Sequence, residues 1–287
     1  MKTADIATRI GLRRCNRSWR GDCPVCGYSR ALSLKENNGR VCAFCANGCT
    51  QKYIIEALAQ AAGGTWSVPS AQAEEAAQAD SRARAASRAA LIWSGSSPAT
   101  DTIADTYLCN RGLPGLAASA TLRFRGDCNH PEGGRYPALV GLVVNVAGQA
   151  TAVHRTYLAA AGHKAAVEPG KASKGQVWGG AIRLDLEAPE IVIGEGIETS
   201  ASAGRIFDLP AWAAISAGNL ARAVKLPPMV RAVVIAADAD NAGRNAAETA
   251  AVRWCAEGRR VRIACPDEAG RDFNDLLRER MEVAHAT

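Results

Sequence analysis

The spacing of apolar residues differs from one part of this chain to the next, and each spacing predicts a different kind of secondary structure. Near the amino terminus, the helically spaced apolar segment 54–58 predicts a short helix that Gly63-Gly64 ends. Segment 67–70 then reads as a connector. Segment 71–90 holds ten alanines, with its acids first and its bases last, and predicts a semi-rigid polar helix that acts as a spacer.

Strand signals dominate residues 91–185. The apolar runs 138–146 and 150–158 flank a short glycine-containing turn, so we expect a β-hairpin there. From Glu190 onward, short apolar runs alternate with helical stretches. The strands expected there are 191–193, 211–215, 233–236 and 261–264, and the clearest helix is 242–257. This alternation predicts a doubly wound, largely parallel α/β sheet.

Composition narrows the class of protein. With 287 residues and 48% apolar content, the chain can fill one large core or two modest ones beside a small module, which excludes disorder throughout. No apolar run follows Met1-Lys2, and the most apolar stretch, 138–146, is much too short to span a bilayer. We therefore expect a cytoplasmic protein that has no membrane partner.

The net charge is placed unevenly. Residues 1–64 contain ten Lys/Arg and four Asp/Glu, and this excess accounts for the whole net charge of +6. A basic amino-terminal module attached to a nearly neutral remainder favours a polyanionic partner, of which nucleic acid is the usual one. Charge alone is equally compatible with a basic surface that is merely solvated.

Cysteines cluster in the same basic module. The chain has ten, and six of them lie within residues 15–49. Cys23 and Cys26 form one C-x-x-C pair, Cys42 and Cys45 form another, and fifteen residues separate the pairs. This spacing predicts a zinc ribbon with four thiolate ligands, in preference to disulfides or buried free thiols. Two further cysteines are ambiguous: Cys49 is near enough to replace a ligand, whereas Cys15 lies outside the paired spacing.

Acidic residues follow two of the expected parallel strands. Glu195 comes at the end of one strand between two glycines, and Asp238 and Asp240 alternate after the strand 233–236. Ligands of open α/β sheets bind at the carboxyl ends of the strands. Three carboxylates delivered there predict a site for Mg²⁺ or Mn²⁺, because oxygen ligands suit these ions. Either motif alone could be an ordinary acidic turn.

The module around Trp19-Arg20-Gly-Asp-Cys23-Pro-Val-Cys26, with its hairpin, second cysteine pair and following helix, resembles the zinc-binding domain of DnaG-type primases. In that family the second ligand is commonly histidine, and Cys26 takes its place here. The resemblance implies contact with a single-stranded template, for which Trp19 and Arg20 are the candidates. Core packing is at least as good an interpretation of Trp19.

Glu195 and Asp238-Ala-Asp240 resemble the signature of Toprim domains, which occur in primases, topoisomerases and some nucleases. The resemblance implies that Glu195 acts as acid/base or metal ligand and that the two aspartates hold Mg²⁺ against nucleotide phosphates. Asp272 resembles a further metal-site acid of primases, while Asn274 stands where many relatives have an acid. Asp275 could be a helix cap only.

Segment 136–175 is similar to the subdomain that precedes Toprim in primases, where basic residues line a groove for template and nucleotide. The matching candidates are Arg155, Lys164 and Lys174, each of which could also be a plain surface charge. For His154, a structural hydrogen bond is a better interpretation than catalysis. Among such primases the chain most resembles the compact zinc–Toprim forms carried by phages, plasmids and other mobile elements.

The expected architecture is an α/β chain with a zinc ribbon, a mixed α+β subdomain and a doubly wound Toprim domain. The expected segments are a zinc-binding module (1–64), an alanine-rich linker (65–97), a basic subdomain (98–188) and the Toprim domain (189–287). The expected function is Mg²⁺-dependent synthesis of short RNA primers from nucleoside triphosphates on single-stranded DNA, with a replicative helicase as a partner in trans.

Two alternatives to a primase stay open: a Toprim nuclease, and a non-catalytic nucleic-acid-binding accessory protein of replication. A topoisomerase would need a tyrosine-bearing DNA-gating domain, for which the chain has no room. A fused helicase is excluded because the sequence lacks a G-x-x-x-x-G-K-[ST] phosphate-binding loop.

Overall fold

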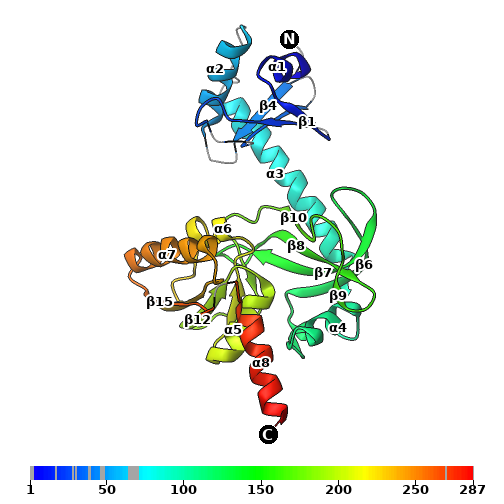
Figure 1. Ribbon diagram of the computed structural model, residues 1–287, viewed down its shortest axis with the longest axis vertical. Coiled ribbons are helices and arrows are strands. Elements are labelled where there is room, and N and C mark those ends of the chain that lie inside the picture. The colour runs from blue at the N-terminus through cyan, green and yellow to red at the C-terminus, as the bar shows by residue number, and fades with distance from the viewer. Residues whose placement is uncertain are drawn as a thin grey trace. The chain divides into compact units, whose positions relative to one another are not determined.

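The computed structural model describes residues 3–16, 18–27, 29, 31–37, 40–45, 49–63, 71–268 and 270–286. The expected connector at 67–70 lies outside these residues. The chain forms two compact units, Met1–Gln78 and Ala79–Thr287, and each is described by itself (Figure 1). In the described part of the chain, no helix is both long enough and apolar enough to cross a membrane.

The first unit is built on a four-stranded antiparallel sheet in which each strand pairs with the next along the chain. Its elements are α1 (Thr3–Arg9), β1 (Arg13–Cys15), β2 (Ser18–Gly21), β3 (Leu32–Asn37), β4 (Arg40–Cys45) and α2 (Gln51–Ala62). Both helices and the sheet share one small core that contains Ile6, Leu32, Leu34 and Leu58. Helix α2 ends at Gly63 in the left-handed conformation, which confirms the predicted helix and its stop.

Helix α3 (Ala71–Ser94) begins in the first unit and continues into the second. It contains the whole alanine-rich segment 71–90, so the predicted helix is confirmed. Within the second unit, Ala89 is buried and joins Val153 and Tyr157 in one apolar cluster. Helix α3 therefore covers one face of the sheet that comes next.

That sheet has six strands, ordered β10-β8-β7-β6-β5, with β9 paired to β8. The strands are β5 (Ser97–Pro98), β6 (Leu122–Asn129), β7 (Arg135–Val144), β8 (Ala150–Ala159), β9 (His163–Lys164) and β10 (Lys171–Gly175). Strands β7 and β8 form the predicted antiparallel hairpin. The prediction of strands in this region missed helix α4 (Ile103–Asn110). Thr102 caps the start of this helix, because its hydroxyl accepts the Ala104 N–H at 3.1 Å. A short 3-10 turn, η1 (Leu116–Ala118), follows it.

The carboxyl-terminal part holds a five-stranded sheet ordered β11-β13-β12-β14-β15, parallel except for β11 at one edge. The strands are β11 (Ile182–Arg183), β12 (Glu190–Gly194), β13 (Ala211–Ala213), β14 (Ala232–Ala236) and β15 (Arg260–Ala264). The helices are α5 (Ile197–Phe207), α6 (Ala217–Arg222), α7 (Asn241–Ala256) and α8 (Phe273–Ala286). The predicted doubly wound sheet is confirmed.

Alternate residues of the central strands point to opposite layers of helices. Val192 and Val234 share a core with Phe273 at the start of α8, whereas Ile193 and Ile235 share one with Trp254 of α7. Figure 1 accordingly shows α5 and α8 on one side of this sheet and α6 and α7 on the other. Because both faces are buried, these strands read as continuous apolar runs in the sequence.

Candidate functional site

The acidic residues follow two neighbouring strands of the five-stranded sheet. Gly194 ends β12 and Ala236 ends β14, and these two residues are partners in the parallel ladder. Glu195 comes directly after β12, and Asp238 comes two residues after β14. Their side chains therefore leave the same carboxyl edge of the sheet, where open α/β sheets bind ligands.

The backbone around these acids is held in place by specific bonds. The Ile215 N–H donates to the Glu195 carbonyl at 2.8 Å, and Ile215 has a φ of 76°, which a β-branched residue rarely adopts. The Thr199 hydroxyl donates to the Asp238 carboxylate at 3.3 Å. Strain that the fold holds beside an acid is typical of functional sites.

Burial raises the pKa of both Glu195 and Asp238, and neighbouring acids add to the effect. Asp238 acts on Glu195, and Asp272 acts on Asp238. The Lys171 ammonium opposes both shifts. A divalent cation would relieve the repulsion between these carboxylates, so the donor set fits Mg²⁺ or Mn²⁺, which bind one or two carboxylates and keep several waters.

The structure does not bring the predicted trio of Glu195, Asp238 and Asp240 into one tight ligand group. Among the described residues, the ligand atoms of these three acids do not all lie within 4.8 Å of one another. Asp240 instead accepts the Gly243 N–H at 2.7 Å and caps helix α7. The helix N-terminus stabilises this carboxylate with its unpaired N–H groups and dipole. The Asp240 charge still raises the pKa of Glu195 and of Asp238, so Asp240 lies near the site while it caps α7.

Asp272 lies in the cavity with Glu195 and Asp238. It also starts helix α8, where it accepts the N–H groups of Asn274 at 2.8 Å and Asp275 at 3.0 Å, while Asp275 accepts the Asp272 N–H at 3.2 Å. This is a reciprocal capping arrangement. Asn274 is fully buried and donates to Ser202 at 3.0 Å and to the Arg111 carbonyl. Asp275 and Asn274 therefore have structural roles, and Asp272 is the acid that faces the cavity.

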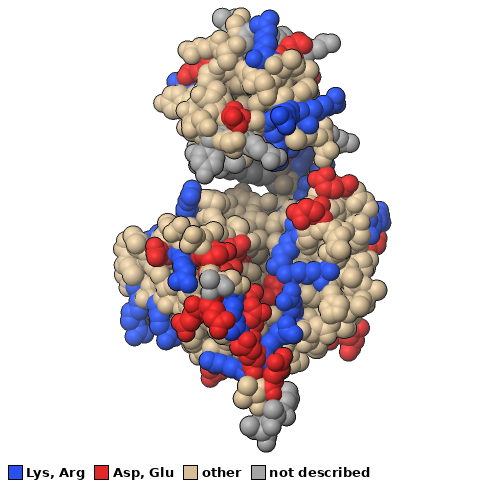
Figure 2. All heavy atoms as spheres, in the orientation of Figure 1, with Lys and Arg blue, Asp and Glu red and all other residues tan. Residues whose placement is uncertain are grey.

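The cavity measures about 190 Å³ and has two walls of opposite charge. We call the acids Glu195, Asp238 and Asp272 its acidic wall and the bases Arg111, Lys164 and Lys171 its basic wall. Glu198, which pairs with both lysines, lines the cavity too. On the second unit, Figure 2 shows acidic side chains gathered beside a column of basic ones. Such an arrangement suits a metal-bound polyphosphate, whose metal and phosphate oxygens need opposite charges.

Three charged residues of this cavity were not among the predicted site residues: Arg111, Lys171 and Glu198. Strand register explains the omission of Lys171. Lys171 pairs with Thr156 and Ser173 with His154, so these residues share one face of the sheet, and Lys174 points to the other. Side chains three residues apart on a strand point to opposite faces, so Lys171 and Lys174 cannot serve one site. This alternation does not show which of them faces the acids.

Arg155 was predicted to bind nucleic acid, and its surroundings argue against this role. Arg155 is only 6% exposed. Its guanidinium donates to the Asn129 carbonyl at 2.9 Å and to the Ala172 carbonyl at 3.3 Å. Arg155 therefore ties strands together beneath α3, on the face where Lys174 also lies. Lys164, in contrast, lines the cavity.

His154 lies on the cavity face and is 8% exposed. Its Nδ1 is 2.9 Å from the Ser173 hydroxyl, the kind of structural hydrogen bond that we expected for it. Burial, with the Lys171 charge, lowers the pKa of His154 to about 4. This histidine therefore stays neutral near pH 7 and adds no positive charge to the basic wall.

Four cysteines of the first unit form a metal-binding group. The sulfur atoms of Cys23, Cys26, Cys45 and Cys49 all lie within 4.8 Å of one another. Cys23 is 3.9 Å from Cys49, and Cys26 is 3.8 Å from Cys45. Sulfur atoms about 2.3 Å from a tetrahedral zinc ion are about 3.8 Å apart. The geometry therefore fits a structural zinc ion held by four thiolates.

Cys42 was predicted as a ligand, and the structure replaces it with Cys49. Cys42 and Cys45 both lie on strand β4, where side chains three residues apart point to opposite faces. Ala43 and Cys45 are buried, whereas Cys42 is exposed. The spacing suggested a turn with two converging thiols, but the second pair is part of a strand.

The other predicted residues of this module differ in exposure. Trp19 is half-buried and packs against the small core, with the Arg14 guanidinium 5.9 Å from its ring centroid. This contact accords with the packing interpretation of Trp19. Arg20 is exposed, and Cys15 is also exposed, outside the metal-binding group.

Gly243 holds Asp238 in place by its lack of a side chain. A Cβ atom on Gly243 would lie 2.7 Å from the Asp238 carbonyl oxygen and 3.1 Å from its nitrogen. We expect Gly243→Ala to destabilise the chain by about 1–3 kcal/mol and to displace Asp238. Urea unfolding checks this result. Gly218→Ala in α6 is the matched control, because nothing lies within 4 Å of its Cβ position; equal effects of the two changes would contradict the prediction.

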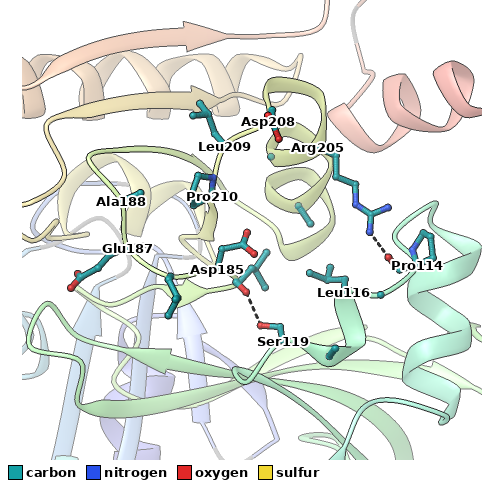
Figure 3. A pocket seen from close by; sticks show the side chains of 16 residues that line it. Pro114, Leu116, Ser119, Asp185, Glu187, Ala188, Arg205, Asp208, Leu209 and Pro210 are labelled. Carbon is teal, nitrogen blue, oxygen red and sulfur yellow. Dashed lines mark hydrogen bonds between the residues drawn. The ribbon is translucent and has the colours of Figure 1, made fainter.

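A larger cavity, about 920 Å³, lies near the amino ends of the parallel strands (Figure 3), and Glu195, Asp238 and Asp272 are not in its lining. It is lined by the end of α5 and by the segments that precede β12 and β13. Arg205 is its basic residue, and its guanidinium already donates to the carbonyls of Gly112, at 2.8 Å, and Pro114. Its acids are Asp185, Glu187 and Asp208, so its lining offers one base where the smaller cavity offers three.

Two family models match parts of the chain. Residues 190–282 match the Toprim domain, and residues 83–184 match a domain of unknown function, DUF7146. Among curated proteins, none matches the chain.

Several solved primase structures are similar to the chain at low identity. A DNA primase domain from Pseudomonas aeruginosa is 18% identical over 70% of this chain and 77% of that one, with a TM-score of 0.48. The zinc-binding and RNA polymerase domains of Aquifex aeolicus primase are 14% identical over 98% and 82%, with a TM-score of 0.49. The primase fragment of the bacteriophage T7 primase-helicase protein is 15% identical over 92% and 98%, with a TM-score of 0.43.

The family match and the site geometry concern the same strands. The matched Toprim region begins at β12 and contains Glu195, Asp238 and Asp272. Residues 190–282 of this chain are therefore a Toprim domain, preceded by a DUF7146 domain at residues 83–184.

Proposed function

We propose that this chain is a DNA primase that joins ribonucleotides on single-stranded DNA in a Mg²⁺-dependent reaction. The observation that carries the proposal is one cavity in which acids of the Toprim domain lie together with Arg111, Lys164 and Lys171 of the DUF7146 region. A nuclease needs the acidic wall, whereas synthesis also needs cations that hold an incoming triphosphate.

Each wall has its own task in this reaction. Glu195 and Asp238 would hold Mg²⁺, which neutralises charge that develops on the α-phosphate. The three cations would bind the phosphate oxygens of the nucleotide.

The four-cysteine module would supply the template contact. Arg20 is exposed on β2, and the module is the most basic part of the chain. We propose that the working segments are those expected from the sequence: 1–64 for zinc and template, 65–97 as linker, 98–188 as basic subdomain and 189–287 for catalysis. A replicative helicase acting in trans is the expected partner.

A synthesis assay tests this function. The full chain is incubated with a panel of end-labelled single-stranded DNAs, four ribonucleoside triphosphates and Mg²⁺, and the products are separated by length. We expect short oligoribonucleotides whose formation needs the DNA. No product with any template or divalent metal would refute the primase function. Shortened DNA would favour the Toprim nuclease, and DNA retention without any product would favour the non-catalytic binding protein.

A further inference from the structure

Glu198 is a buried carboxylate to which the reaction described above gives no task. It lies in the first turn of α5, three residues after Glu195, and its side chain is only 7% exposed. An ionised carboxylate is costly to bury unless partners bond both of its oxygens. Its partners therefore indicate what the fold gains from it.

Three partners surround the Glu198 carboxylate. Oε2 is 3.1 Å from the Lys171 ammonium, and Oε1 is 3.8 Å from that of Lys164 and accepts the Tyr107 hydroxyl proton. Burial alone would raise the pKa of Glu198, but the two lysines and Tyr107 hold it well below its usual range. Glu198 is thus a fixed negative charge behind the basic wall.

The lysines come from a different part of the chain than the glutamate. Lys164 lies on β9 and Lys171 on β10, within the DUF7146 region, while Glu198 belongs to the Toprim domain. Their bonds to Glu198 therefore fix basic side chains of one domain against the active edge of the other. Both lysine side chains are still 35–40% exposed, so each presents its ammonium group to the cavity.

Lys171 is also close to the acidic wall. A Cβ atom on Gly196, the residue after Glu195, would lie 3.8 Å from the Lys171 ammonium. Lys171, Glu195 and Asp238 line the same small cavity. A lysine ammonium on a flexible four-carbon stem would turn toward these acids if nothing held it back. There it would compete with a cation for the same carboxylates.

We propose that Glu198 is a positioning residue that holds Lys171 and Lys164 on the basic wall, so that Lys171 does not pair with Glu195 and Asp238 and these acids stay open to a divalent cation. This inference rests on the proposed metal site and deepens it. Glu198 itself touches neither metal nor nucleotide. Its buried charge separates the two walls of the cavity.

Binding of Mn²⁺ to the full chain, in the absence of nucleotide and DNA, tests the inference directly. We expect Glu198→Gln to weaken Mn²⁺ binding by about 10–100-fold, the usual effect of removing a group that orients a metal site. Lys171→Met alone should leave Mn²⁺ binding as tight as in the unchanged chain or tighter. The double variant should bind Mn²⁺ as Lys171→Met does, because the competing ammonium is gone. Titration calorimetry or the electron paramagnetic resonance signal of free Mn²⁺ measures all of these affinities.

Glu187→Gln is the control, since Glu187 pairs with Arg183 at 3.4 Å outside this cavity. Unchanged Mn²⁺ affinity in Glu198→Gln would overturn the inference. So would weakened binding that the second substitution fails to restore, because Glu198 would then support the site in some other way. If Glu198→Gln does not fold, Tyr107→Phe removes one bond to the carboxylate, and an unchanged Mn²⁺ affinity in that variant overturns the inference.

The result is independent of primer synthesis. A chain that shows this pattern of Mn²⁺ affinities but makes no primers keeps the inference and refutes the proposed function. A chain that makes primers while Glu198→Gln binds Mn²⁺ normally keeps the function and refutes the inference.

Discussion

Asp238→Asn and Glu195→Gln are each expected to reduce primer synthesis by roughly a hundredfold to a thousandfold, because a divalent metal contributes several kcal/mol to such a reaction. The same variants should fold normally. Rates of ribonucleotide incorporation and zinc content measure the two properties. Glu190→Gln is the matched control, since Glu190 is an exposed acid at the opposite end of β12. Full activity in either site variant would refute the site.

Stability should change in the opposite direction from activity. Burial and neighbouring acids raise the folded-state pKa of Asp238, so its charged form costs stability at any pH above its unfolded pKa of about 4. Without metal at pH 7, Asp238→Asn should therefore melt at the same temperature as the unchanged chain or higher. Added Mg²⁺ should raise the melting temperature of the unchanged chain and not that of the variant. A lower melting temperature of Asp238→Asn without metal would contradict this account.

Cys49→Ser is expected to abolish tight zinc binding and to unfold the first unit. Zinc bound by four thiolates contributes on the order of 10 kcal/mol of apparent folding free energy to small modules. Without a metal, bonds from Cys26 and the other thiols raise the pKa of Cys49 to about 12, so the crowded sulfurs need a cation to become thiolates. Atomic emission measures the zinc, and circular dichroism measures the fold.

Cys42→Ser distinguishes the zinc ligands seen in the structure, which include Cys49, from those predicted by the C-x-x-C spacing, which include Cys42. Cys42 is exposed on β4 and lies outside the four-sulfur group, so its substitution should leave zinc content and template use unchanged. Loss of zinc in Cys42→Ser together with retention in Cys49→Ser would restore the C-x-x-C prediction and refute the structural one.

The sequence predicted elements more reliably than it predicted side-chain directions. The central parallel strands β12 and β14 were visible because both faces of the sheet are buried there, so each strand appears as one apolar run. The β7–β8 hairpin was visible because a glycine turn separates two apolar runs. The sequence did not predict helix α4, because this helix is short and lies among strand-like segments.

The site was harder to predict, because motifs state which residues are near a strand end and not where each side chain turns. Asp238 and Asp240 are both in the Asp-x-Asp motif, yet one faces the cavity and the other caps α7. Lys171 and Lys174 are both in one basic run, yet strand alternation separates them. Glu198 stands in the same motif as Glu195, but the motif did not predict its role, because its partners Tyr107, Lys164 and Lys171 lie far away in the sequence.

Release of pyrophosphate on single-stranded DNA tests the central claim most directly, because nucleotidyl transfer releases one pyrophosphate for each bond formed and DNA cleavage releases none. The account predicts pyrophosphate release that requires DNA template, ribonucleotides and Mg²⁺ together and that is lost in Asp238→Asn. A zinc-loaded, folded chain that releases no pyrophosphate on any template, or that releases it equally in Asp238→Asn, would contradict the account.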